Sequence, residues 1–345
     1  MYDALLIVSF GGPERREDVL PFLENVTRGR NVPRERLLEV AEHYYQLGGK
    51  SPINDHCREL IAKLRNELTL PIYWGNRNWH PFLLDTLQQM RGDGIQHAVA
   101  FVTSAYSSYS GCRQYRENIA AAQNVLGQGA PKIDKLPVFY NHPGFIRACV
   151  DRVREALGRF LPNKANLPNP PIRLVISAHS IPVWMAAGSA YERQLRETAR
   201  LVAEAVGFSE WDLVFQSRSG PPSQPWLGPD ILDHLRKLRS DGVENVLVAP
   251  LGFVSDHVEV LYDLDTEAQN LAKELGINMV RAATAGTHPA FVGMIREMVE
   301  ERILRNEPIT SDACPQDCCP APQPGAQKPA DRSPVLAVRT GVPQS

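Results

Sequence analysis

Short apolar runs recur along the chain, and each is followed by a polar turn and then by a longer segment with helical periodicity. The runs are rich in Val, Ile and Leu and lack the alternation of a half-exposed strand: ALLIVSF, AVAFVTSAY, IRLVISAHS, LVFQSRSG and VLVAPLGF. Unalternated strands separated by helices indicate parallel sheets covered on both faces. The pattern therefore predicts an α/β protein.

The predicted strand–helix units fall into two groups, in residues 1–142 and in residues 143–307. We expect two similar Rossmann-like, doubly wound parallel-sheet domains that face each other across a cleft. The remaining segment, residues 308–345, is rich in Pro with scattered Gly, Gln and Ser, and it carries three of the six cysteines. Its composition predicts a tail that is mostly disordered.

Composition narrows the possible partners. The 37 basic and 39 acidic side chains leave a net charge of −2, which gives no global attraction to nucleic acid. No apolar run is long enough to predict a transmembrane segment, and the start MYDALLIVSFGGP lacks the basic cluster of a signal peptide. We therefore expect a cytoplasmic protein whose cysteines serve as thiols or as metal or cluster ligands.

Unusual polar clusters follow the predicted strands directly: Ser-Phe-Gly-Gly, Ala-His-Ser, Gln-Ser-Arg-Ser-Gly and Ser-Asp-His. In open α/β sheets the carboxyl ends of the strands border a ligand-binding crevice, so these clusters should lie together. Neither a GxGxxG motif after the first strand nor a GxxxxGK[ST] motif is present, which disfavours nucleotide chemistry.

A row of carboxylates is expected beside this crevice. In SDHVEVLYDLD and the residues just beyond it, Asp256, Glu259, Asp263 and Glu267 fall within about 80° of one helix face. Like charges at this spacing repel weakly, so the row is either a solvated acidic face or the wall of a site that receives a cation. Close carboxylates also raise some of their pKa values, which would let part of the row pass on protons near neutral pH.

His179, in ISAHSIP at the end of an apolar strand, is the candidate for the opposite wall. It is either a core histidine with a backbone partner or a metal ligand and general base. A flat, apolar substrate would also need aromatic side chains, which singly are more typical of ordinary packing. Those near the crevice are Phe10, Tyr44, Tyr45, Tyr106, Tyr109, Tyr115 and Trp226.

Several of these segments together resemble one family. SAHSIP, SRSGPPSQPWLGPD and PLGFVSDHVEVLYDLD, with VSFGGPE and TSAYSSYSGCRQYREN in the first half, are similar to segments of the ferrochelatases, over residues 3 to about 307. These enzymes insert ferrous iron into a porphyrin. The residues in these segments are most similar to those of the actinobacterial branch. The resemblance therefore implies coproporphyrin III as the substrate and coproheme formation in haem biosynthesis.

The resemblance implies roles for particular residues. His179 and Glu259 would be iron ligands or proton acceptors on opposite sides of the porphyrin, with Asp256, His257 and Asp263 as supporting groups. Asp263 replaces a Glu that some relatives carry, and Phe10 replaces a Tyr, so its phenyl ring cannot ligate iron. Substrate contacts would come from Phe10, Arg28, Arg30, Tyr44, Ser51, Tyr115 and Trp226, with the arginines suited to propionates.

Other functions stay open alongside this one. The alternatives are a protoporphyrin IX ferrochelatase, a noncatalytic tetrapyrrole carrier in which His179 binds haem, and a cobalt chelatase of corrinoid synthesis. The FLEN to SPIN segment argues against the last of these. A haem-pathway enzyme would also be expected to contact neighbouring pathway enzymes transiently.

The tail sequence ACPQDCCPAP suggests a second metal site. Cys314, Cys318 and Cys319 lie within six residues, and adjacent cysteines do not easily bond to each other, so zinc or an iron–sulfur cluster would explain them. The resemblance implies a [2Fe–2S] cluster completed by Cys149. The alternative for Cys149 is packing, because it shares an apolar helix face with Ile146, Val150 and Val153.

Overall fold

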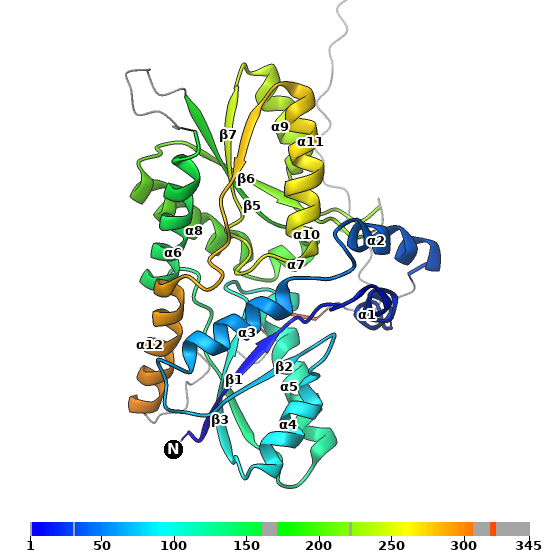
Figure 1. Ribbon diagram of the computed structural model, residues 1–345, viewed down its shortest axis with the longest axis vertical. Helices are drawn as coiled ribbons and strands as arrows, with labels where there is room; N and C mark the ends of the chain where they lie inside the picture. Colours follow the sequence, from blue (N-terminus) through cyan, green and yellow to red (C-terminus); the bar gives the residue numbers. More distant parts are fainter. Residues whose placement is uncertain (1, 30–31, 161–170, 221–222, 306–317, 322–345) are drawn as a thin grey trace, which may run out of the picture.

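A computed structural model describes residues 2–29, 32–160, 171–220, 223–305 and 318–321, so Arg30, Cys314 and most of the tail lie outside it. The described chain forms two four-stranded parallel sheets with helices packed against them (Figure 1). The predicted α/β class, with two Rossmann-like units, is confirmed.

Both sheets have the same strand order. The first is ordered β2-β1-β3-β4 and the second β6-β5-β7-β8, so in each the first strand of the unit lies second from one edge. The strands of the first sheet are β1 (Ala4–Ser9), β2 (Ile72–Asn76), β3 (His97–Val102) and β4 (Lys132–Lys135). Those of the second are β5 (Ile172–His179), β6 (Trp211–Gln216), β7 (Asn245–Ala249) and β8 (Asn278–Arg281).

Helices connect the strands and cover the sheets. In the first half they are α1 (Val19–Val26), α2 (Arg34–Gln46), α3 (Ile53–Leu64), α4 (Leu83–Gly92) and α5 (Gln114–Leu126). From there on they are α6 (Pro143–Leu157), α7 (Val183–Ala187), α8 (Tyr191–Val206), α9 (Ile231–Ser240), α10 (Val258–Val260), α11 (Gln269–Leu275) and α12 (Pro289–Arg305). Three short elements complete the set: η1 (Arg16–Asp18), η2 (Tyr109–Arg113) and η3 (Leu261–Ala268).

One apolar core extends through both halves. Its centre is a group of four fully buried phenylalanines, Phe101, Phe139, Phe145 and Phe291, from β3, the loop after β4, α6 and α12. The rings of Phe101 and Phe139 stack with centroids 5.0 Å apart. Since α12 packs on α6 and also on α3 and β3, this last helix ties the second half of the chain to the first sheet.

Direct hydrogen bonds reinforce this junction. The Tyr106 hydroxyl donates to the Leu251 carbonyl over 2.7 Å, and the Ser107 amide donates to Gln194 Oε1 over 2.7 Å. Both residues of the first half are buried, so these bonds are shielded from water. The two sheets are therefore held in one arrangement, and the carboxyl ends of β1, β5 and β7 keep fixed positions.

Helices α1 and α2 form an arm that projects to one side of the molecule (Figure 1). Phe22 of α1 and Tyr44 of α2 pack in one apolar cluster with Val258 of α10. The arm, which belongs to the first half of the chain, therefore contacts the acidic segment of the second half.

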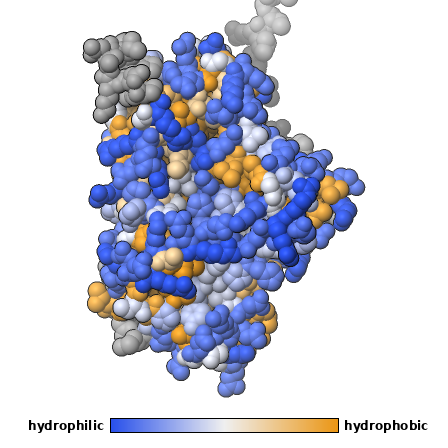
Figure 2. Space-filling model, viewed as in Figure 1, coloured by the Kyte–Doolittle hydropathy of each residue, from blue (hydrophilic) through white to orange (hydrophobic). Residues whose placement is uncertain are grey.

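The outer surface is mixed in character. Figure 2 shows a mostly hydrophilic face with hydrophobic residues in small groups, one of them near α10 beside the arm. Within the described ranges, no helix combines the length and apolar character needed to cross a membrane.

Candidate active site

His179 ends β5 and is held by the backbone that follows it. Its Nδ1 forms a short hydrogen bond with the Ser180 carbonyl, and its own carbonyl accepts a hydrogen bond of 2.9 Å from the Tyr191 hydroxyl. Since a carbonyl only accepts, Nδ1 carries the proton and Nε2 of the neutral ring keeps a lone pair. That Nε2 lies 3.5 Å from Oε2 of Glu259, so the two residues predicted on opposite walls face each other.

Glu259 lies in α10, just after β7, and a second imidazole contacts it. His257 Nε2 is 3.3 Å from Glu259 Oε2, the same oxygen that His179 approaches. Burial raises the pKa of Glu259, but the hydrogen bond from His257 and the positive charge that His179 and His257 carry when protonated outweigh this and hold it at about 2. The Glu259 side chain is still 45% exposed, so a substrate can reach an ionised carboxylate.

The contact with Glu259 also raises the pKa of His257. Burial lowers the pKa of His257, but its hydrogen bond to Glu259 and the charge of that carboxylate raise it above the ordinary value overall. His257 is therefore biased toward its protonated form. Across the described part of the chain, no three His, Cys, Asp or Glu side chains are arranged to hold a metal ion together.

Asp263 lies four residues after Glu259, in the π-helical segment η3. Burial raises the pKa of Asp263, the short hydrogen bond from the Ser217 hydroxyl opposes the rise, and the charges of Glu259 and Glu267 add to it, giving a value of about 7. Ser217 has a left-handed backbone with a φ of 62°. π-Helical turns and left-handed non-glycine residues are both uncommon, and both are frequent at functional sites.

Asp256 does not lie on the row predicted from the helical arc. His257 has an extended backbone, with φ of −150° and ψ of 177°, so the helix begins only at Val258. The Asp256 carboxylate instead pairs with Arg281 of β8, with Oδ1 3.1 Å from Nη1. The row therefore begins at Glu259, and the negative charge of Asp256 is neutralised by an arginine.

Phe10 and Tyr115, two of the predicted substrate contacts, are joined by an arginine that the sequence analysis missed. The Arg77 guanidinium lies 5.7 Å from the Phe10 ring centroid and 4.7 Å from that of Tyr115. Tyr115 is buried at 5% exposure, so Arg77 covers it. The signal in the sequence was GNRNW, a polar cluster at the end of β2, but the strand before it was not recognised.

The other described substrate-contact candidates are Tyr44, Ser51, Trp226 and Arg28. Burial raises the pKa of Tyr44 and the charge of Glu259 raises it further, so its hydroxyl lies within electrostatic reach of that carboxylate. Ser51 is buried against Gly12, where an added Cβ would lie 2.7 Å from the Cβ of Ser51. Trp226 pairs with Pro182, three residues after His179. Arg28 is exposed in the turn after α1.

The three remaining aromatic candidates have other partners. Tyr106 is a core residue at the junction of the two halves, where its hydroxyl bonds Leu251, so it does not line a substrate site. The Tyr109 hydroxyl donates to Glu117 over 3.0 Å, and Tyr45 lies under the Arg16 guanidinium at 3.9 Å.

The described cysteines do not gather at one point. Cys149 is buried in α6, and burial raises the pKa of its thiol to about 12, which disfavours the thiolate that a metal requires. Cys318 Sγ instead accepts a hydrogen bond from Arg116 Nη2 of α5 over 3.2 Å. Cys149, Cys318 and Cys319 form no metal-holding group, and Cys314 lies outside the described residues.

Comparison of the fold with solved structures shows which class of proteins has this architecture. SirB from Bacillus subtilis with Fe3+ aligns with a TM-score of 0.56 at 14% identity, covering 89% of this chain and 100% of SirB. The sirohydrochlorin chelatase SirB of B. subtilis subspecies spizizenii, in complex with cobalt, aligns with a TM-score of 0.52 at 11% identity, covering 91% of this chain and 98% of the other. The fold is that of the chelatases.

Comparison of the sequence identifies the family. The chain belongs to the Ferrochelatase family, which it matches over residues 2–303, and it is therefore a metal chelatase. It is 54% identical to the ferrochelatase of Rhodopirellula baltica, over 92% of this chain and 93% of the relative. It is 50% identical to the coproporphyrin III ferrochelatase of Streptomyces coelicolor, over 94% and 96% of the two chains. The resemblance predicted from the motifs is confirmed.

The raised pKa of Asp263 predicts that replacing this residue with a neutral one stabilises the protein, and that the stabilisation depends on pH. Because folding raises this pKa from 3.8 to about 7, the protonated carboxyl is favoured in the folded state. Wild-type stability is therefore lost as the pH rises through this range. Asp263→Asn removes the ionisation, so its advantage in free energy of unfolding should grow from about pH 4 to pH 7 and reach on the order of 2 kcal/mol, after discounting for solvent screening.

Urea denaturation between pH 4 and pH 8 measures this difference. Asp241→Asn is the matched control, because Asp241 is 49% exposed in a surface ion pair with Lys237 and should show no such gain. An Asp263→Asn curve parallel to wild type across this range would contradict the raised pKa.

Proposed function

We propose that this chain inserts ferrous iron into coproporphyrin III to form coproheme in haem biosynthesis. The observation that carries the proposal is the contact between His179 Nε2 and Glu259 Oε2, 3.5 Å apart at the carboxyl ends of two neighbouring strands. The substrate is taken from relatives such as the S. coelicolor enzyme. In this proposal the protein works in the cytoplasm and contacts neighbouring haem-pathway enzymes transiently.

Insertion requires a base and a replacement for the water ligands of the metal. Two pyrrole N–H protons must leave the porphyrin as iron enters. His179, with its proton fixed on Nδ1 by the Ser180 carbonyl, offers Nε2 as the acceptor. Glu259, with a pKa of about 2, stays anionic and offers oxygen to the ferrous ion that is the second substrate. Asp263, with a pKa of about 7, can take up and release protons near neutral pH.

Removing either facing group should impair insertion while leaving the fold intact. His179 and Glu259 are partly exposed at 32% and 45%, so both contribute more to reaction than to packing. We expect His179→Ala to lower kcat/KM by more than tenfold, a loss above about 1.4 kcal/mol. Glu259→Gln should lower turnover severely while porphyrin binding changes little, because the shape is kept and only the charge is lost.

An anaerobic assay of porphyrin fluorescence loss on addition of ferrous iron measures both variants, with porphyrin affinity titrated separately. Asp233→Asn is the control, since its carboxylate is 76% exposed on α9. A His179→Ala enzyme that retains more than about a tenth of wild-type kcat/KM would exclude His179 from the mechanism. Haem binding with no insertion by the wild-type protein would favour the noncatalytic carrier instead.

The number of propionates should decide substrate preference. Coproporphyrin III has four propionates where protoporphyrin IX has two, and guanidinium groups pair with carboxylates by charge-assisted hydrogen bonds. The candidate donors are Arg28, Arg30 and Ser51, together with Arg77, whose guanidinium lies over the Tyr115 ring. We expect a higher kcat/KM for coproporphyrin III, measured side by side with protoporphyrin IX. Equal values, or a preference for protoporphyrin IX, would reject this choice of substrate.

From the sequence we also propose a [2Fe–2S] cluster held by Cys314, Cys318, Cys319 and Cys149. Cys318 Sγ accepts a hydrogen bond from Arg116 Nη2, so its sulfur is ordered beside α5. The buried thiol of Cys149, whose pKa is about 12, counts against its membership. No step of iron insertion is assigned to the cluster.

If the cluster forms, protein purified without oxygen should be reddish-brown and contain about two iron and two sulfide ions per chain. Cys318→Ser and Cys149→Ser should each abolish this content, whereas Cys57→Ser, a buried thiol elsewhere in the core, should retain it. Retention by Cys149→Ser would remove Cys149 from the ligand set. Colourless protein after reconstitution, or stoichiometric zinc, would reject the cluster.

A further inference from the structure

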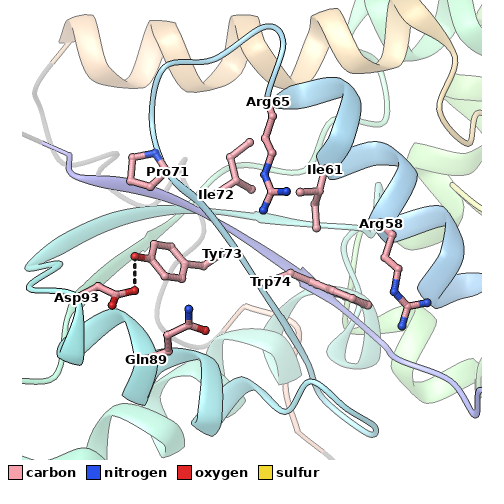
Figure 3. A pocket seen from close by; sticks show the side chains of 9 residues that line it. All are labelled: Arg58, Ile61, Arg65, Pro71, Ile72, Tyr73, Trp74, Gln89 and Asp93. Atoms are coloured by element: carbon pink, nitrogen blue, oxygen red, sulfur yellow. Dashed lines mark hydrogen bonds between the residues drawn. The ribbon is translucent and has the colours of Figure 1, made fainter.

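A cavity of about 590 Å³ lies along the edge strand β2, between α3 and α4 (Figure 3). Its size is in the range of small-molecule sites in proteins. One wall comes from Arg58 and Ile61 of α3 and from Arg65, which directly follows that helix. These three residues recur at helical spacing, so they share one face.

This cavity is separate from the candidate active site. It is lined by Pro71, Ile72, Tyr73 and Trp74, at the start and middle of β2, whereas the crevice borders the carboxyl ends of the strands. None of the residues predicted for iron or porphyrin contact lines it.

The lining combines a cation with aromatic and aliphatic surface. Arg65 forms no ion pair with any residue that the structure describes, and Figure 3 shows its guanidinium directed toward Ile72. Trp74 and Tyr73 add aromatic surface from β2. On the wall formed by α4 and its C-cap, Asp93 accepts a hydrogen bond of 2.8 Å from the Tyr73 hydroxyl. Gln89 lies one helical turn before Asp93. A ligand with a flat ring and one anionic group would match this combination, because arginine binds carboxylates and phosphates strongly.

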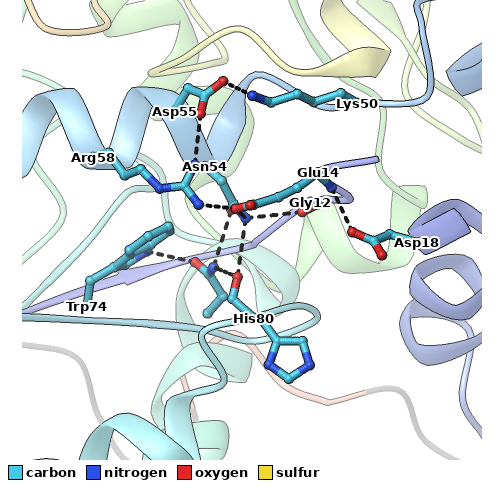
Figure 4. Close-up of polar contacts among 10 residues, drawn as sticks. Gly12, Glu14, Asp18, Lys50, Asn54, Asp55, Arg58, Trp74 and His80 are labelled. Carbon is cyan, nitrogen blue, oxygen red and sulfur yellow. Dashed lines mark hydrogen bonds and ion pairs between the residues drawn. The ribbon is translucent and has the colours of Figure 1, made fainter. Parts of the chain in front are cut away.

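Polar contacts of Arg58 and Trp74 fix another part of the cavity wall in advance (Figure 4). Arg58 pairs with Asp55 and Glu14, and its guanidinium lies 5.5 Å from the Trp74 ring centroid. The Trp74 Nε1 donates to Asn76 Oδ1 over 2.9 Å, which sets the ring plane. Because Arg58 is already neutralised, Arg65 is the cation left for a ligand. A wall held in this way loses little freedom on binding.

We propose that this cavity is a second ligand site, distinct from the iron-insertion crevice, and that it binds a planar aromatic anion. The ring lies between Trp74 and the aliphatic side chains of Ile61 and Ile72, and the anionic group pairs with Arg65. Carboxylate and phosphate share this chemistry, so ligands with the same ring distinguish them.

The test uses full-length protein labelled with 5-fluorotryptophan. The chain has five tryptophans, and each gives a fluorine NMR signal of its own. Trp74→Phe assigns the signal of Trp74, while Trp226, which pairs with Pro182 near His179, reports on the candidate active site. We expect 2-naphthoate to shift the Trp74 signal alone and saturably, with a Kd of about 1 mM or tighter. 2-Naphthyl phosphate tests the phosphate arm, and the neutral 2-acetylnaphthalene should bind at least about tenfold more weakly, since it lacks the charge-assisted bond.

Arg65→Gln should weaken 2-naphthoate binding by about tenfold, again through loss of the charge-assisted bond. Arg193→Gln, which removes an exposed charge from α8, is the matched control and should bind normally. The proposal is overturned by an unshifted Trp74 signal with both naphthyl anions, by equal binding of the neutral ketone, or by equal losses in the two arginine variants. None of these outcomes depends on iron insertion.

Discussion

The shared apolar core is the constraint on which the site depends, because the titratable groups His179 and Glu259 come from the second half of the chain while Phe10, Arg77 and Tyr115 come from the first. The phenylalanines of β3, α6 and α12 join the two halves, and the Tyr106 bond to Leu251 crosses the same junction. Close packing of this kind transmits displacement rather than absorbing it. The carboxyl ends of β1 and β5, which Phe10 follows and His179 forms, therefore stay at a fixed separation.

Within the crevice, two carboxylates on one short segment are given opposite properties by their neighbours. Glu259 receives two imidazole contacts on one oxygen and has a pKa of about 2. Asp263, four residues later, has one hydroxyl donor and two neighbouring carboxylates, and its pKa is about 7. Desolvation acts on both in the same direction, so the partners decide the difference. One group thus stays charged for a cation while the other can exchange protons.

Much of this could be predicted from the sequence, and the failures have two causes. The strands β1, β3, β5 and β7 are internal and mostly buried, and the edge strand β6 is buried over its last four residues, so their apolar runs predict strands. The missed strands β2, β4 and β8 are edge strands, short and partly polar, and their patterns do not stand out from the connecting loops. Because the sequence does not predict β2, it also gives no reason to place Arg77, which directly follows β2, at the site. Asp256 failed for another reason, since the arc assumed a helix that the extended backbone of His257 delays.

The two halves share a strand order but differ in one connection, and that difference assigns their roles. From β1 to β2 the chain runs through residues 10–71, whereas the equivalent connection from β5 to β6 spans only residues 180–210. The longer connection contains α1 and α2, which reach across to Val258 and stack His43 on Tyr262 at 3.7 Å. The first half therefore supplies a covering arm, and the second half supplies the titratable groups beneath it. In the proposed function, the first half would cover a flat substrate and the second half would alter it chemically.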